Sequence, residues 1–341
     1  AAIPAGLRKP DGTLFTIDDP ISAIAHLNVI TGASPPAGEV VSPLLEEPYT
    51  REANIGWAHL IGRSTALTAD YVRVEGRYLN MRIRPNVLVN GQRFLAGISV
   101  SPGNQNFRTA LSKGSSRYDG LILALRRRMS TGLDVTASYT LAKATSDVGT
   151  AYDEIVQNLI QDVTNPFGPV QDGPSTRTDA RHRLTVSAIV EAPWGLRVAP
   201  MFFYRSALPT HSFEGLDRNA DGNVNDKTAV AYRFTGLNDN GSASFEENGN
   251  CQTVNCSRRA SFSQLNLRVS RLFPLWREVR IEAIAELFNV FNAKNPSIPL
   301  TTQRLSANGA PLLSFMQPTA FAGDVQQPEQ RVGQIGFRVT F

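Results

Sequence analysis

Hydrophobic and polar residues alternate one by one along nine segments of the sequence. In the segment 133–141, Leu133, Val135, Ala137, Tyr139 and Leu141 occupy alternate positions, and mostly polar residues stand between them. Successive side chains of a β-strand point to opposite faces, so this period predicts strands with one apolar and one polar face. The other eight segments are 51–61, 65–75, 120–128, 183–191, 196–206, 262–272, 279–287 and 331–341.

The connections between these segments are alternately short and long. The short ones are 62–64, 128–132, 193–195 and 273–278, and the long ones are 76–116, 144–182, 207–261 and 290–330. Strands of about ten residues, with short turns at one end and long loops at the other, are typical of transmembrane β-barrels. Soluble sandwiches have shorter strands and do not sort their loops by length in this way. We therefore expect an all-β fold, an antiparallel transmembrane β-barrel with short periplasmic turns and long extracellular loops.

The last segment carries the alternation to the final residue. Its apolar positions are Ile335, Phe337, Val339 and Phe341. In a barrel this face would contact lipid, and Phe341 would lie at the periplasmic interface. Further aromatic residues close to the short turns are Trp194, Phe273 and Trp276, with Trp57 nearby. They suit an interfacial girdle, and ordinary core aromatics are the alternative interpretation.

The number of segments bears on the organisation of the chain. If the short turns are periplasmic, the segment 51–61 runs inward, so we expect 1–50 to be an extracellular loop segment and 51–341 the barrel. Single-chain bacterial barrels have an even number of strands. Either one strand escapes the pattern, at 79–84 or within 1–50, or the chain is the back part of a larger barrel whose plug and N-terminal domains are absent. We favour the second interpretation, a partial barrel of about nine to ten strands.

Charged residues within the segments are expected to point into the barrel. A charge on the lipid side costs about 2–4 kcal/mol near the midplane, so inward placement is the physical expectation. They either contact a solute or a plug, or pair with one another, and pairing is the interpretation we favour. The residues are Arg183, Glu191, Arg197, Arg268, Glu282, Glu286 and Arg338.

Composition excludes some classes of protein and constrains the compartment. The net charge of +4 is weak and evenly spread, with no basic stripe carrying interleaved aromatics, which argues against nucleic-acid binding. The sequence contains no run of 18 apolar residues, so no transmembrane helix is predicted. Ala1 is not followed by a basic and then an apolar signal region, so any export signal is absent or already removed. Cys251 and Cys256 lie close together in a polar stretch and fit a local disulfide in an oxidising compartment.

One stretch resembles the front of a calcium-binding loop. Oxygen-bearing side chains recur at alternate positions in 217–226, with Gly222 available for a sharp turn. The twelfth position, where a calcium loop has a bidentate Glu, is Thr228, and only Asp226 could replace it. A hydrated turn without metal is the alternative. The candidate calcium ligands are Asp217, Asn219, Asp221, Asn223 and Asp226.

The sequence carries no recognisable catalytic motif. The four histidines are scattered and form no H-E-x-x-H pair, and G-x-S-x-G, P-loop and dinucleotide-binding patterns are missing. His182 lies where a long loop enters a strand, and we expect a loop-to-barrel contact there. We therefore expect a protein that is not an enzyme and has no cofactor other than the candidate calcium ion.

Several motifs follow one another along about 48–341. They are PYTREANIGWAHLIGRSTALTADYVRVEGR, YDGLILALRRRMSTGLDVTASYTLAKATSD, TDARHRLTVSAIVEAPWG, GLDRNADGNVNDK, FSQLNLRVSRLF, IEAIAELFNVFN and QIGFRVTF. Their order and spacing resemble the C-terminal barrel region of TonB-dependent outer-membrane receptors, above all the receptors with an N-terminal carboxypeptidase-regulatory-like domain. The resemblance implies part of a 22-stranded barrel around a plug, although this chain shows neither a plug nor a TonB box. It also implies that Ile335, Phe337, Val339 and Phe341 form the signal read by the barrel-assembly machinery.

The resemblance further implies a function and a set of partners. We expect a receptor or transporter in the bacterial outer membrane that takes up a scarce solute such as a sugar, a peptide or a metal chelate. Its partners would be outer-membrane lipid, the extracellular solute and the TonB complex, the last through the missing N-terminal portion. Loop aromatics that suit such solutes are Tyr152, Phe167, Phe213 and Tyr232. A structural or adhesive surface protein and a passive porin-like channel remain the alternatives.

Overall fold

The structure is a computed structural model. It describes residues 39–41, 45–83, 86–93, 108–130, 132–147, 173–174, 178–224, 226–276, 278–296, 302–318, 321 and 331–341. None of the helices in this part of the chain has the length and apolar character needed to cross a membrane. Of the segment 1–50, only 39–41 and 45–50 are among the described residues.

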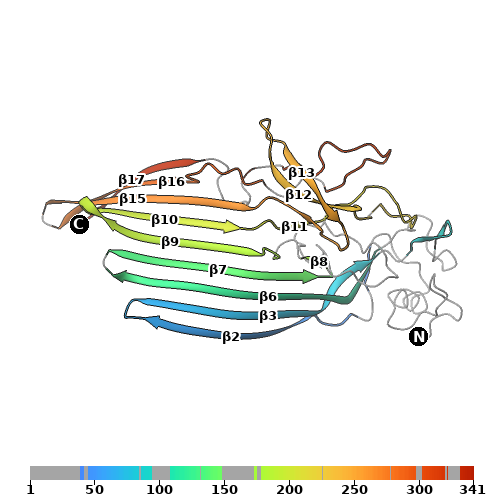
Figure 1. The fold of residues 1–341 in the computed structure, drawn as a ribbon, viewed down its shortest axis with the longest axis horizontal. Coiled ribbons are helices and arrows are strands. Elements are labelled where there is room, and N and C mark those ends of the chain that lie inside the picture. The colour runs from blue at the N-terminus through green and yellow to red at the C-terminus, as the bar shows by residue number, and fades with distance from the viewer. Residues whose placement is uncertain are drawn as a thin grey trace.

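In the described part of the chain, nine long strands form one antiparallel sheet, and each pairs with the next long strand along the chain (Figure 1). The order across the sheet is β17-β16-β15-β10-β9-β7-β6-β3-β2. All nine segments predicted from the alternation are strands, so the predicted fold class is confirmed. The strands are β2 (Tyr49–Ile61), β3 (Thr65–Ile83), β6 (Arg108–Ser130), β7 (Leu133–Ser146), β9 (His182–Ala192), β10 (Leu196–Arg205), β15 (Phe262–Trp276), β16 (Val279–Phe288) and β17 (Val332–Thr340).

The register aligns the apolar positions of all nine strands on one side of the sheet. Leu123 on β6 stands opposite Ala69 on β3 and Tyr139 on β7. The same side continues through Leu184 on β9 to Ile335 on β17. We call this side the apolar face and the other the polar face. Side chains on the apolar face are exposed: Leu123 is 41% exposed and Ile335 is 79% exposed. This is the arrangement required of a surface that contacts lipid.

The strands extend beyond the predicted segments at the end of the long connections. β3 has 19 residues and β6 has 23, and they remain paired to Ile83 and Thr109 across irregularities at Leu79. The interpretation of 79–84 as a separate, tenth strand is therefore wrong, because residues 79–83 continue β3. The short strand β1 (Glu39–Val41) pairs in parallel with the start of β6, and at three residues it is too short to span a membrane.

The short turns lie together at one end of the sheet (Figure 1). The turn between β9 and β10 is the 3-10 segment η2 (Pro193–Gly195), in which Trp194 has a φ of 62°. Trp194 is 80% exposed at this turn, and Trp276, at the end of β15, is 71% exposed. These indoles are not core aromatics, and their exposure beside the turns suits the predicted girdle.

The long connection after β10 contains a second sheet that sequence analysis treated as a loop. This four-stranded sheet has the order β11-β14-β12-β13. Its strands are β11 (Pro209–Thr210), β12 (Val230–Leu237), β13 (Ala243–Asn250) and β14 (Ser257–Arg258). Two further small elements lie in other long connections, the hairpin of β4 (Leu88–Val89) with β5 (Gln92–Arg93), and β8 (Gly173–Pro174), which pairs with β7.

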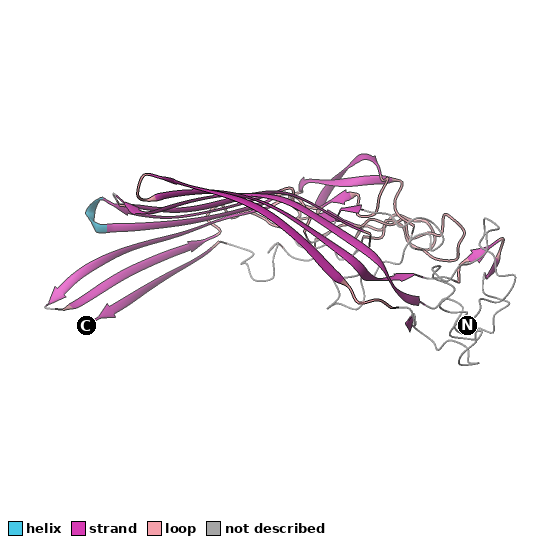
Figure 2. Ribbon diagram, turned by 90° about the horizontal axis from the view of Figure 1, so that it is seen from below, coloured by secondary structure: helices cyan, strands magenta, loops and turns pink. Residues whose placement is uncertain are grey.

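The main sheet is curved and has two edges (Figure 2). Among the described residues, β2 pairs only with β3, and β17 pairs only with β16. Backbone groups at a sheet edge cannot remain unpaired in hydrocarbon, so a membrane barrel needs further strands between these two edges. The arrangement is that of a partial barrel, as the sequence predicted.

Candidate functional site: the polar face and the extracellular cap

All seven charged residues predicted to point inward lie on the polar face. Across the sheet, Glu191 pairs in register with Arg197, Arg268 with Glu286, and Glu282 with Arg338. Arg183 lies on the same face, opposite Thr140 of β7. The alternation of the sequence therefore places these charges together, although lumen-facing placement stays a prediction.

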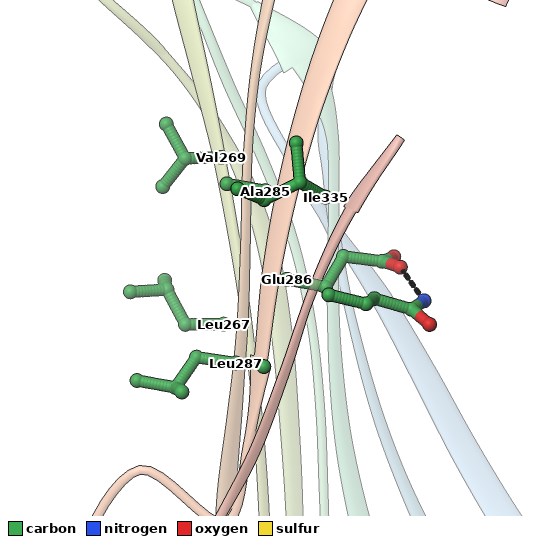
Figure 3. A pocket seen from close by; sticks show the side chains of 8 residues that line it. Leu267, Val269, Ala285, Glu286, Leu287 and Ile335 are labelled. Carbon is green, nitrogen blue, oxygen red and sulfur yellow. Dashed lines mark hydrogen bonds between the residues drawn. The ribbon is translucent and has the colours of Figure 1, made fainter. Parts of the chain in front are cut away.

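Six of these seven side chains form ion pairs with one another. Arg268 lies 3.4 Å from Glu286 and 3.8 Å from Glu282, and Arg338 lies 3.5 Å from Glu282. Arg197 lies 3.3 Å from Glu191, and the Gln334 amide donates a hydrogen bond to Glu286. Figure 3 shows Glu286 on the opposite side of the strands from Leu267 and Leu287. Within the predicted set, the pairing interpretation therefore accounts for every charge except that of Arg183.

The opposite side of the same strands carries a shallow apolar groove (Figure 3). Leu267, Val269, Leu287 and Ile335 line it beside Gly333, whose missing side chain leaves the space open. The groove belongs to the apolar face, because Leu267 stands opposite Leu287, and Leu287 opposite Gly333. Its chemistry suits an acyl chain and not a polar solute.

At the other end of the strands, the long connections pack on one another. We call their described residues the extracellular cap. They are 86–93, 173–174, 178–181, 206–224, 226–261, 289–296, 302–318 and 321. The connection after β10 contacts the other three: Leu88 N–H donates to Asp221 O at 2.6 Å, Asn255 Nδ2 to Pro174 O at 3.1 Å, and Leu305 N–H to Glu214 O at 2.9 Å. The cap is thus one packed unit built from four connections.

Two ion pairs with buried carboxylates join the connections of the cap. Glu214, 3% exposed, accepts hydrogen bonds from Arg304 at 2.6–2.7 Å, and Arg218 lies 3.6 Å away. Asp179, 2% exposed, accepts from Arg258 at 2.9 Å and from the backbone N–H of Ala144 on β7. Because a buried carboxylate needs a partner, each pair fixes one connection against another or against the main sheet.

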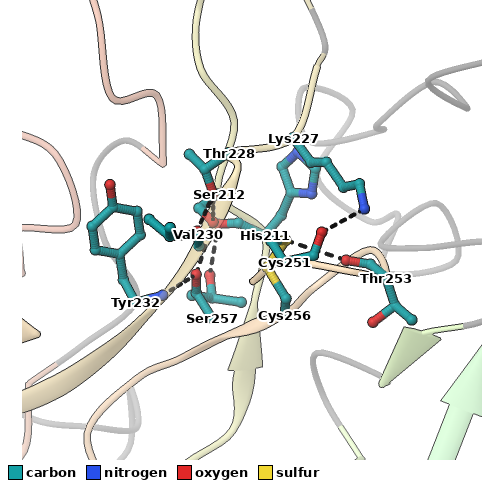
Figure 4. The surroundings of a disulfide bond; sticks show 11 residues. His211, Ser212, Lys227, Thr228, Val230, Tyr232, Cys251, Thr253, Cys256 and Ser257 are labelled. Atoms are coloured by element: carbon teal, nitrogen blue, oxygen red, sulfur yellow. Dashed lines mark hydrogen bonds between the residues drawn. A yellow bond between two sulfur atoms is a disulfide. The ribbon is translucent and has the colours of Figure 1, made fainter. Parts of the chain in front are cut away.

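A disulfide and a chain of hydroxyl groups join segments at the ends of the strands of the four-stranded sheet (Figure 4). Cys251 and Cys256 form the disulfide. Thr228 Oγ1 donates to Val230 O, so it accepts from Ser212, which lies 2.8 Å away. Ser212 in turn accepts from Ser257 at 2.7 Å, and Ser257 accepts from the backbone N–H of Tyr232. Because each hydroxyl has a single proton, all the hydrogen bonds in this series run in the same direction. They satisfy the three buried hydroxyl groups of Ser212, Thr228 and Ser257.

His211 lies beside this chain in an environment that disfavours its charged form. Its side chain is 5% exposed and stacks on Phe213, with ring centroids 5.7 Å apart. Its Nδ1 has no hydrogen-bond partner among the described residues. Burial lowers the pKa of His211 from 6.5 to about 3, and burial also lowers the pKa of the neighbouring Lys227, shown with it in Figure 4. His211 is therefore held neutral and packs as an aromatic ring.

The stability of the cap is expected to fall at acidic pH because of His211. Its folded pKa lies below its unfolded value, so protons bind the unfolded state preferentially as the pH drops from 6.5 toward 3. The loss is up to about 1.4 kcal/mol per pH unit in that window, and none is expected from this group above it. Hydrogen exchange of cap amides, corrected for the intrinsic pH dependence, measures it. His211→Phe should remove part of the slope.

The candidate calcium residues lie together in a turn. This turn contacts the β4–β5 hairpin, because Leu88 N–H donates to Asp221 O. The Asp217 carboxylate accepts the backbone N–H groups of Asp221 and Gly222, at 3.0 and 2.7 Å. Asp226 accepts those of Arg218 and Asn219. Asn223 is buried, and its Oδ1 has no hydrogen-bond partner among the described residues. No group of three or more His, Cys, Asp or Glu side chains is arranged for a metal in the part of the chain that is described, and calcium binding stays a prediction.

The loop aromatics have packing partners where they are described. Tyr232 makes an edge contact with Phe315 at 5.1 Å between centroids, and Phe213 stacks on His211. Tyr152 and Phe167 lie outside the described residues. The loop-to-barrel contact expected at His182 is wrong: His182 is the first residue of β9, and its Nδ1 lies 2.7 Å from the hydroxyl of Tyr139 on the neighbouring strand β7. The sequence did not predict the ion-pair residues of the cap, which are Asp179, Glu214, Arg258 and Arg304. The only signal of folded structure there was the length of the turn-rich connections.

Comparison with known proteins identifies the kind of barrel. A family model described as "Outer membrane beta barrel domain" matches residues 5–334. The outer membrane transporter YddB from Escherichia coli superposes with a TM-score of 0.50 at 11% identity, over 88% of this chain and 34% of YddB. The pyoverdine outer membrane receptor FpvA from Pseudomonas aeruginosa, bound to pyoverdine, gives 0.48 at 10% identity, over 89% and 31%. No curated protein matches the chain by sequence.

The extent of these matches limits what they show. The chain spans about a third of the length of the two solved structures. At 11% identity the likeness to YddB concerns the fold alone. The coverage of 34% of YddB agrees with a sheet in which β2 and β17 each have a single partner strand among the described residues.

Proposed function

The chain belongs to the outer membrane beta barrel domain family, and we propose that it forms the C-terminal strands of a TonB-dependent receptor that takes up a scarce solute. The bacterial outer membrane is its location, which agrees with the family and with the fold of YddB. YddB is described as an outer membrane transporter, which supports transport as the role of this fold. A sugar, a peptide or a metal chelate is the class of solute we propose.

The observation that carries this proposal is the extracellular cap. Two carboxylates that are 2–3% exposed join three of the connections, and a backbone hydrogen bond from Leu88 to Asp221 adds the fourth. The longest connection also carries a disulfide. Loops held in one arrangement can form a specific binding surface without paying a large ordering cost when the solute arrives. A passive channel needs only an open entrance, and an adhesive protein needs no polar lumen below its loops.

The proposed partners follow from the same reading. The plug and the contact with the TonB complex would come from a preceding portion of a larger protein. The terminal residues Ile335, Phe337, Val339 and Phe341 are exposed on the apolar face and would be read by the barrel-assembly machinery. No catalytic role is proposed.

Depletion of solutes from the growth medium tests the proposed function. Cells with the natural gene, cells without it, and cells with the gene but without TonB are grown in the same solute-limited medium. We expect at least one solute to be depleted only when both the gene and TonB are present. Equal depletion without TonB would indicate a passive pore, and no gene-dependent depletion would contradict a role in uptake.

A conductance measurement separates the remaining alternatives. In planar bilayers the natural full-length protein should be nearly silent, because a plug fills the barrel. Large steady conductance would contradict the plugged receptor and support a porin-like channel. A silent protein that depletes no solute, but is needed for cells to bind a surface, would support the adhesive alternative.

A further inference from the structure

A group of charged side chains lies on the apolar face of four strands, just beyond the apolar side chains. It comprises seven residues of β2, β3, β6 and β7, which we call the cationic belt. Five are basic and two acidic, so its net charge is +3. The residues are Arg51, Arg73, Arg77, Arg117 and Lys143, with Glu75 and Asp119.

The strand register arranges the belt in rows with an acid between two bases. In one row Arg73, Asp119 and Lys143 stand side by side on β3, β6 and β7. In the next row Arg51, Glu75 and Arg117 stand side by side on β2, β3 and β6. Arg77 follows one step further out, opposite Tyr49. Neighbouring strands are about 4.8 Å apart, so one anionic group can reach several of these cations at once.

The two acids pair with three of the bases and leave the belt cationic. Glu75 accepts from Arg73 at 2.9 Å and lies 3.4 Å from Arg77. Asp119 lies 2.6 Å from Arg117 and accepts from the Tyr71 hydroxyl. Arg51 instead lies over the Tyr49 ring, 5.2 Å from its centroid. Arg73, Arg77 and Arg117 keep 41–52% of their side chains exposed, so their charge is available to a partner.

The belt lies at the height of the outer membrane–water interface. Residues Arg73 to Arg77 follow Thr65, the start of β3 at a short turn, by eight to twelve positions. At about 3.3 Å per residue and a tilt of about 40°, this places them roughly 20–30 Å above that turn, where the apolar band of about 25 Å ends. Tyr49, Tyr71 and Tyr78 accompany the belt and are each 39–40% exposed, as aromatic residues at an interface commonly are.

We propose that the cationic belt binds the phosphate groups of anionic lipids in the outer leaflet. The acyl chains of such a lipid would lie on Leu121, Leu123 and Leu141 of the apolar face, directly below the belt. Charge complementarity favours this occupant, because basic side chains beside hydrocarbon meet lipid phosphates before any soluble partner. The belt lies on the apolar face and the seven predicted inward charges lie on the polar face, so the inference is independent of the transported solute.

Lipid titration in native mass spectrometry tests the proposal on the natural full-length protein in detergent micelles. The probes are phosphatidylglycerol and phosphatidylcholine with identical acyl chains, and inorganic phosphate as a competitor. We expect tighter binding of phosphatidylglycerol than of phosphatidylcholine, weakened by 1 M salt. Arg51→Gln/Lys143→Gln should reduce phosphatidylglycerol affinity about 30-fold, at roughly 1 kcal/mol for each basic side chain. Phosphatidylcholine binding should not change.

The matched control removes two charges from the polar face of the same sheet. Arg126→Gln/Arg183→Gln should leave phosphatidylglycerol affinity within about twofold of the natural protein, and the shift of folded barrels on unheated gels verifies that both variants fold. Equal affinity for the two lipids, or an equal loss in the control, would overturn the proposal. Complete displacement by millimolar inorganic phosphate would also overturn it, since the belt would then be a phosphate site without a lipid requirement.

Discussion

A Leu123→Arg variant is expected to lose about 2–4 kcal/mol of folding free energy in a bilayer. Leu123 lies on the apolar face of β6, midway between Leu121 and Leu125, and stands opposite Ala69 and Tyr139 on the neighbouring strands. An arginine there would place its charge in hydrocarbon. Denaturant unfolding in lipid vesicles measures the effect, and the loss of the folded form on unheated gels is the readout.

The neighbouring Ile122 provides the matched control. It lies one residue away on the polar face, opposite Asp70 and Thr140. Ile122→Arg should change the stability by less than about 1 kcal/mol, because its guanidinium reaches water and the Asp70 carboxylate. If both variants were equally destabilised, position 123 would not face lipid.

Arg304→Met is expected to release the connection after β16 from the rest of the cap. Among the described residues, it leaves Arg218, 3.6 Å away, as the ion-pair partner of the buried Glu214 carboxylate. Removing one member of such a pair costs about 3 kcal/mol, toward the low end of the range for buried pairs because Arg304 is 30% exposed. Hydrogen exchange of the amides of Phe213 and Leu305, which bond across the junction, reports the local free energy.

A double variant distinguishes the lost pair from lost packing. In Arg304→Met/Glu214→Gln no buried carboxylate remains, so much of the protection at Leu305 should return. Exchange elsewhere on β3 and β6 should be unchanged in both variants. Equal exchange in the single and double variants would show that the Arg304 stem, and not its charge, holds the junction.

The strands of the main sheet could be predicted because lipid imposes a simple rule on each of them. Leu133 to Leu141 alternate with polar residues for the same reason that Ile335 to Phe341 do: one side meets hydrocarbon and the other water. The rule also predicts that Arg268, Glu282 and Arg338 lie on one face, and they form ion pairs there. Local sequence was sufficient because the solvent, and not distant contacts, sets the pattern.

The cap could not be predicted, because contacts between distant residues determine it. Glu214 and Arg304 are 90 positions apart, and Asp179 and Arg258 are 79 apart. β12 and β13 lack an uninterrupted alternation, and irregularities interrupt their pairing after Val230 and after Phe234. The extension of β3 and β6 beyond the predicted segments could not be predicted for a related reason. Outside the membrane, no lipid enforces a two-residue period.

The central claim is that the apolar face contacts lipid while the polar face meets water. Spin labels on single introduced cysteines test it directly, because both natural cysteines are in the disulfide. Labels at Leu123, Val135 and Ile281 should collide more with dissolved oxygen than with a water-soluble nickel chelate, and labels at Ile122 and Thr136 should show the reverse. Labels at the first three positions that are shielded from both reagents, as in a dry protein core, would contradict the account.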